Sequence, residues 1–181
     1  FVGWVLLLMA QAALASAGRV RLHRQIGVAG MAYGAFVFLI GVMVSIGAPA
    51  LRVRAGDFPV EVGGMVAILS LADLVLFGAF LAFAFAYRSQ PEVHKQWVVA
   101  ATAALGGAAV GRVLKSDSLA YLLVWLSPVL AIIAIDLASR RRLSAVPFVS
   151  GGLIVVSFFK AQLLAAPIWG EFGRALVRPF V

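Results

Sequence analysis

Six apolar segments, each about the length of a membrane-crossing helix, fill most of this 181-residue chain. A helix needs roughly 20 mostly apolar residues to cross a hydrocarbon layer of ~30 Å, and in lipid its backbone polar groups must be satisfied within the segment. The sequence therefore predicts an all-α fold, a polytopic transmembrane helical bundle with a single domain over residues 1–181. The predicted helices are Phe1–Ala17, Gly27–Ala48, Val60–Tyr87, Trp97–Leu114, Leu119–Leu137 and Val146–Trp169.

Composition excludes several classes of protein. Charged residues make up 12% of the chain, about half the share in a soluble domain. Cysteine is absent, which excludes disulfides, Cys-ligated zinc, iron–sulfur clusters and thiol catalysis. The net charge of +8 comes from basic residues at segment ends, where they meet lipid headgroups rather than nucleic acid. No Walker loop, HExxH, GxSxG or paired-carboxylate motif occurs, so we predict no metal site and favour a protein that is not an enzyme.

The distribution of Lys and Arg predicts an orientation in a bacterial inner membrane. Alternate loops carry eight and six basic residues, and cytoplasmic loops are the more basic ones. This bias places loops 18–26, 88–96 and 138–145 in the cytoplasm. Aromatic residues prefer the membrane interfaces, so we expect Trp4 and Trp169 near the outer interface and Trp97 near the inner one.

The segments pair into three hairpins, and the first two basic loops end alike. His23-Arg24-Gln25 and His94-Lys95-Gln96 each open the next predicted helix. The match falls at the same topological position, so it predicts a degenerate, parallel hairpin repeat, a kind of duplication common in membrane folds. Arg140–Arg142 would mark a third copy.

Two pairs of glycines follow the histidine motifs. Gly30 and Gly34 form one pair, and Gly107 and Gly111 form the other. Small residues four positions apart let helix backbones approach closely in lipid. The alternative is that glycine is simply frequent in membrane helices. We favour packing, and we expect these two faces to dock on another membrane protein.

Asp73 and Lys160 are ionisable residues predicted to lie at nearly the same membrane depth. A charge at the bilayer centre costs at least ~2.5–3.5 kcal/mol on insertion scales, so opposite charges at one depth predict a pair. We favour an internal staple, or a Lys160 that extends to the interface alone. A proton or ion relay, and a neutral, hydrogen-bonded Asp73, are the alternatives. A retinal Schiff base with its counter-ion has no further support in the sequence.

His23 and His94 are the two histidines of the chain, and both are predicted on the same membrane side. If the duplicated hairpins share an axis, both rings could face one haem iron from opposite sides. We favour an interfacial anchor that binds headgroups and loop carbonyls, with haem ligation and pH-sensitive gating as alternatives. Gln11 is expected to hold helices together, and Asp136 to pair with Arg140 one turn away.

The pattern of these residues resembles an uncharacterised family of bacterial multi-pass membrane proteins. The matching positions are Trp4 and Gln11, Leu22-His23-Arg24-Gln25-Ile26-Gly27, Asp73, His94-Lys95, Arg112 and Asp136. Gln96-Trp97 and Ile135 depart from the family pattern. The resemblance implies one more helix before Phe1, and so seven helices in the complete protein, but it implies no activity.

Three classes of function follow. We favour a non-catalytic accessory or scaffold subunit that docks on other membrane proteins, or on copies of itself, and binds lipid or a cofactor. The second class is a redox protein holding b-type haem on His23 and His94. The third is a small proton- or ion-coupled transporter that uses Asp73 and Lys160.

Overall fold

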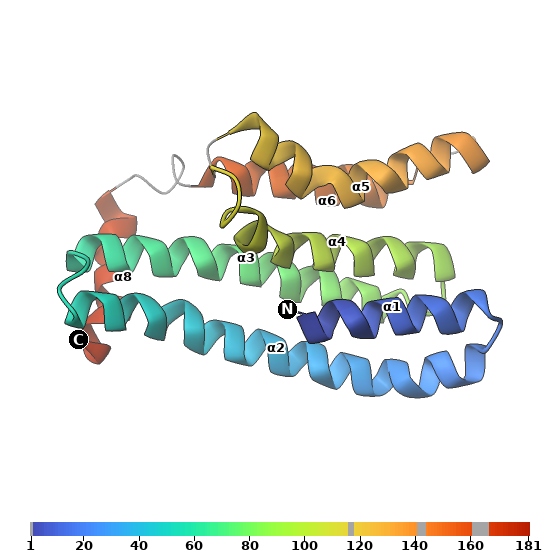
Figure 1. Cartoon of the computed structure of the whole chain (residues 1–181), viewed down its shortest axis with the longest axis horizontal. Coiled ribbons are helices and arrows are strands. Elements are labelled where there is room, and N and C mark those ends of the chain that lie inside the picture. The colour runs from blue at the N-terminus through green and yellow to red at the C-terminus, as the bar shows by residue number, and fades with distance from the viewer. Residues whose placement is uncertain (1, 116–117, 141–143, 161–166) are drawn as a thin grey trace.

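The computed structural model describes residues 2–115, 118–140, 144–160 and 167–181, and within these ranges the chain is helical without a strand. The elements are α1 (Val2–Ser16), α2 (Val20–Arg54), α3 (Val60–Ala86), α4 (Pro91–Val110), α5 (Leu119–Arg140), α6 (Ala145–Phe158), α8 (Pro167–Val177) and the short 3-10 helix η1 (Arg178–Phe180). The first six helices form three hairpins, with α3–α4 between α1–α2 and α5–α6 (Figure 1). α3 contacts α2, α4, α6 and α8, so it is the centre of the bundle.

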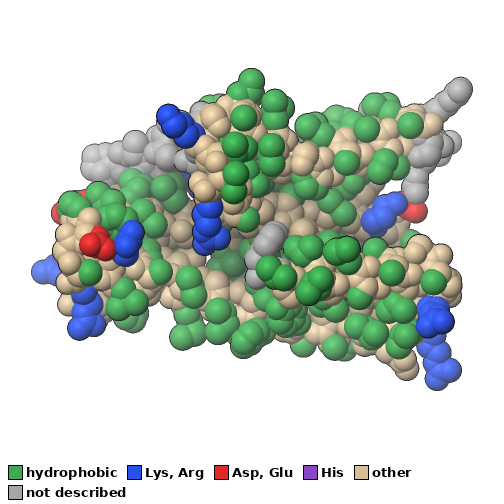
Figure 2. Space-filling view, viewed as in Figure 1, with side chains coloured by type: hydrophobic (Ala, Val, Ile, Leu, Met, Phe, Trp, Pro, Cys, Tyr) green, Lys and Arg blue, Asp and Glu red, His purple; other side chains and the backbone are tan. Residues whose placement is uncertain are grey.

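The surface of the bundle matches a lipid environment. α2, α3 and the Leu119–Ala138 part of α5 are each long and apolar enough to cross a membrane. Large apolar side chains point outward, including Leu6 (60% exposed) and Met43 (69%). Figure 2 shows such side chains along the visible flank, while most Lys and Arg lie toward the ends. Contiguous apolar surface of this extent is rare on monomeric soluble proteins and normal against acyl chains.

The polar connections between the first four helices are shorter than predicted. α2 begins at Val20 rather than Gly27, and α4 begins at Pro91 rather than Trp97. Gly18, with a φ of 70°, lies between α1 and α2, in the left-handed region that glycine adopts without strain. The helix α2 begins two residues after Gly18, because the Arg, Leu and Gln residues that follow are good helix formers whether or not lipid surrounds them. For α2 and α4, hydropathy therefore located the lipid-facing part of the helix and not its true start.

The sixth predicted segment does not form one helix in the described part of the chain. α6 ends at Phe158, residues 161–166 lie outside the described ranges, and Trp169 belongs to the separate helix α8. The described residues therefore contain seven α-helices where six were predicted. α8 runs across the ends of α2 and α3, roughly perpendicular to them (Figure 1).

α8 crosses α3 with backbone touching backbone. A Cβ atom added to Gly64 would lie 2.4 Å from the carbonyl carbon of Gly173, so these glycines allow the close approach. Val177 is fully buried against α2 and α3 beside Ala50 and Ala67. This contact fixes the C-terminal helix on the bundle end that carries Arg52 and Arg54.

Candidate functional site

Asp73 is the central residue of α3, about 20 Å from either end of the helix at 1.5 Å per residue. The Oγ of Ser157 donates to its Oδ1 at 2.6 Å, and the Nζ of Lys160 donates to its Oδ2. The same Nζ lies 5.7 Å from the ring centroid of Trp125, within the range of a cation–π contact. The structure thus brings a carboxylate from α3, an indole from α5 and two donors from the end of α6 into one cluster.

This cluster has the chemistry of a staple between α3 and α6. The side chains of Asp73 and Lys160 are 20% and 18% exposed, and an unpaired charge at such a site is strongly unfavourable. Both oxygens of Asp73 are already bound by donors of the same chain, which favours the staple over a proton relay. α6 is about 21 Å long, shorter than the hydrocarbon layer, and Lys160, two residues beyond its end, contacts Asp73 at the middle of α3.

A second polar network holds the opposite end of α6. The Nε2 of Gln96 donates to the Oδ2 of Asp136 at 2.8 Å, and the Oγ of Ser144 donates to the Oε1 of Gln96 at 2.7 Å. Ser144 also caps α6 by accepting from the backbone N–H of Val146. Gln96 and Asp136 are 2% and 3% exposed. The network therefore ties α4, α5 and α6 together inside the bundle.

Asp136 lies one turn before the end of α5 at Arg140, and its side chain is buried against α4 rather than exposed at the helix end. The side chain of Arg140, its expected partner, lies outside the described residues. The burial of Asp136 was not predicted, because a helix can bury a carboxylate only once a donor such as the Gln96 amide faces it.

The two histidines meet although they lie on different hairpins. Their ring centroids are 6.5 Å apart and their planes are inclined by 83°. The Nδ1 of His94 donates to the carbonyl of Ala84 at 2.7 Å, and the Nδ1 of His23 lies 3.2 Å from the carbonyl oxygen of Gln11. Each ring is thus oriented through Nδ1 by the preceding helix of its own hairpin, an arrangement that also prepares Nε2 for a ligand.

Gln11 connects α1 to the start of α2. With its amide oriented so that the nitrogen faces His23, the side-chain nitrogen lies 2.6 Å from the Nδ1 of His23 and 3.1 Å from the His23 carbonyl, and the side-chain oxygen accepts from the N–H of Gly27 at 2.9 Å. The side chain and the backbone carbonyl of Gln11 thus both lie at Nδ1 and orient the His23 ring. Of the basic neighbours, Arg24 is exposed and Lys95 pairs with Glu92 at 2.8 Å.

Side chains of this chain pack against the predicted glycine faces. A Cβ on Gly34 would lie 2.6 Å from Leu81, and one on Gly107 would lie 2.8 Å from Trp125. Gly30 and Gly111 face Leu7 and Tyr121 at 3.3 and 3.5 Å. Gly34 and Gly107 serve close packing within the bundle, and docking of the glycine faces on another protein stays a prediction. Arg112 is exposed, two residues beyond the end of α4.

Trp4 lies in the core rather than at the outer interface. It is 5% exposed, its ring packs edge-on against Phe77 at 5.4 Å, and its Nε1 donates to the Oγ1 of Thr102 at 3.1 Å. Phe77 is one helical turn from Asp73, so Trp4 lies near the middle of α3. The aromatic-belt expectation for Trp4 is wrong because a partner hydroxyl on α4 satisfies the indole N–H at this depth.

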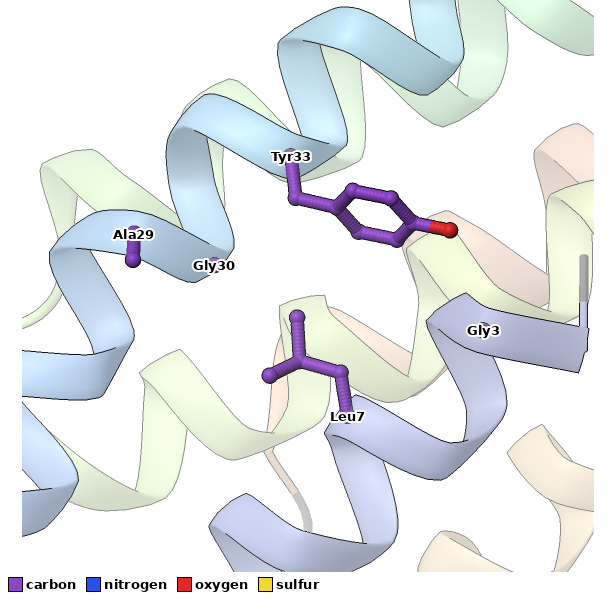
Figure 3. A pocket seen from close by; sticks show the side chains of 5 residues that line it. All are labelled: Gly3, Leu7, Ala29, Gly30 and Tyr33. Atoms are coloured by element: carbon purple, nitrogen blue, oxygen red, sulfur yellow. The ribbon is translucent and has the colours of Figure 1, made fainter.

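A shallow hollow of about 310 Å³ lies between α1 and α2. Figure 3 shows Leu7 and Tyr33 reaching into it from the two helices, with Gly3, Ala29 and Gly30 along its sides. The Tyr33 hydroxyl is the polar side-chain group of this lining. The hollow has the character of a packing gap between helices rather than of a site for polar chemistry.

Sequence reasoning missed the polar partners Gln96, Ser144, Ser157 and Thr102. A signal existed for two of them: Gln96 ends the second copy of the repeated motif His-Arg/Lys-Gln, and Ser157 precedes Lys160 by one helical turn. Comparison with protein-family models, with curated proteins and with solved structures finds no match for this chain. The resemblance to a bacterial membrane family therefore stays a prediction.

Replacing either Asp73 or Lys160 alone should lower the free energy of unfolding more than replacing both together. Asp73→Asn or Lys160→Met leaves an uncompensated group in the bundle, so each should lower the free energy of unfolding by about 3 kcal/mol or more. The double variant Asp73→Leu/Lys160→Met should recover most of that loss. Unfolding in mixed detergent, followed by circular dichroism, measures these values.

Arg52→Gln is the control, because it breaks the exposed pair with Asp57 (3.1 Å). It should change the free energy of unfolding by less than ~1 kcal/mol. Equal losses in all variants would contradict the staple.

Proposed function

We propose that this protein is a non-catalytic subunit of a bacterial inner-membrane complex, an accessory or scaffold protein that docks on another membrane protein or a second copy of itself. Short connections support this proposal: three residues join α1 to α2, five join α2 to α3 and four join α3 to α4. The polar side chains at membrane depth hold helices of this chain together. The surface of the described bundle that is available for contact with another membrane protein is therefore apolar.

One exposed stripe on α2 carries the proposal. Its side chains are 42–69% exposed and recur at spacings of three, four and seven residues, which places them on one face of the helix: Phe36, Leu39, Ile40, Met43, Val44 and Leu51. The stripe extends about 22 Å, most of a hydrocarbon layer. Gly34 and Gly41, on the other side of α2, pack against α3. The free stripe fits the apolar face of another transmembrane helix.

The orientation and the repeat belong to the same proposal. The α1–α2 and α3–α4 connections lie at one end of the bundle (Figure 1), which supports placing both on the same side of the membrane. Their basic residues favour the cytoplasm for that side; residues 141–143 of the third loop lie outside the described part. The matched Nδ1 contacts of His23 and His94 support a hairpin duplication. Gln25 is exposed whereas Gln96 is buried, so the two copies have diverged.

Photo-crosslinking in native membranes tests the docking stripe. A photoreactive amino acid at Met43 should give a protein adduct of one discrete mass, because a partner helix would cover that position. The matched control is Leu123 on α5, which is 50% exposed and should give lipid adducts. Lipid adducts alone at both positions would contradict the proposal.

The paired histidines favour a second candidate, a b-type haem-binding redox protein. Two imidazoles on opposite sides of one metal, with metal–nitrogen bonds of ~2.0 Å, place their ring centroids about 6 Å apart, close to the observed 6.5 Å. The orientation of each ring through Nδ1 suits ligation by Nε2.

An absorption spectrum of the purified protein separates the two candidates. A haem protein should show a Soret band that is lost in His23→Ala and in His94→Ala. Lys95→Gln, a change beside His94 on an exposed side chain, should keep the band. A spectrum without a Soret band, or one that both alanine variants leave unchanged, removes this candidate and leaves the docking proposal standing.

A further inference from the structure

A second hollow lies where the end of α2 meets the C-terminal turn. It measures about 460 Å³ and is lined by Gly47, Ala50, Leu51 and Arg54 of α2 and by Pro179, Phe180 and Val181. Its walls are apolar except for the backbone and one charged side chain, Arg54. An anionic group joined to an apolar chain matches this combination.

The charges around the hollow leave Arg54 available. Two arginines at this end of the bundle are paired with acids: Arg52 with Asp57 at 3.1 Å, and Arg174 with Glu61 at 3.7 Å. Arg54 has no acidic partner among the described residues, and it is exposed. A guanidinium in this state is suited to bidentate binding of a phosphate.

The position of the hollow indicates the membrane boundary. Arg54 is the last residue of α2, and Leu51, one turn earlier, is 65% exposed at the end of the apolar stripe. On the neighbouring helix α8, Trp169 and Phe172 are 39% and 53% exposed. Aromatic and basic side chains gather in this way at the level of lipid headgroups.

We infer that this hollow binds one anionic phospholipid. The phosphate contacts the guanidinium of Arg54, and an acyl chain lies along Gly47 and Leu51 against the ring of Phe180. A free phosphate would use the arginine but not the apolar walls, so a lipid is the better match. This site needs the chain to be in a membrane, and it shares Leu51 with the end of the proposed docking stripe, so a partner helix on α2 must leave that residue to the lipid.

Native mass spectrometry of the full chain in detergent tests the site, with phosphatidylglycerol and phosphatidylcholine of identical acyl chains as probes. One phosphatidylglycerol should be retained in preference to phosphatidylcholine, and an excess of inorganic phosphate should not displace it. Arg54→Gln should weaken retention at least about tenfold, because it removes the charge-assisted hydrogen bonds of the bidentate contact. Arg52→Gln is the matched control and should retain the lipid.

Gly47→Leu examines the apolar part of the site. A Cβ on Gly47 meets no atom within 4 Å, so leucine should fill the hollow without disturbing the fold and should weaken lipid retention while Arg54 is intact. Equal retention of the two lipids by the unaltered protein, displacement by inorganic phosphate, or equal behaviour of Arg54→Gln and Arg52→Gln would each overturn the inference. The unaltered protein alone decides the matter if a variant does not fold.

Discussion

A carboxylate in the hydrocarbon layer has no water to bind, so its partners must come from the protein. Asp73 is such a group, at the centre of the most connected helix of the bundle. Its two oxygens are met by Ser157 and Lys160, which lie at the end of a helix shorter than the membrane is thick. The position of the C-terminal end of α6 is therefore fixed by its contacts with the Asp73 carboxylate in α3.

The same requirement governs the rest of the interior. Gln96 and Asp136 satisfy each other in the core and reach Ser144 at the start of α6, so polar contacts hold this helix at both ends. Trp4 finds a hydroxyl on α4. Where no polar group is present, glycines admit large side chains from neighbouring helices. With its polar groups engaged inward, the bundle presents apolar flanks to lipid or to a partner, and this is the basis of the proposed role.

The sequence predicted the helix ends correctly where the apolar segment and the helix have the same boundaries. The ends of α3 were predicted to within one residue, and opposite charges at one depth predicted the pairing of Asp73 with Lys160. It was a poor guide where a helix extends beyond the apolar region, as at the starts of α2 and α4, because helix propensity does not depend on lipid contact. The burial of Asp136 and Trp4 could not be predicted, since it depends on Gln96 and Thr102, which lie across the bundle and far along the chain.

The contact between Asp73 and Lys160 in a real bilayer is the central claim. Solid-state NMR of the isotope-labelled protein in lipid bilayers can measure the dipolar coupling between the lysine Nζ and the aspartate carboxyl carbon, with Asp73→Asn identifying the signal of this pair. A coupling that corresponds to about 4 Å or less is predicted, the range of a direct ion pair. A spectrum that Asp73→Asn leaves unchanged would show that the two groups are apart and would contradict the account.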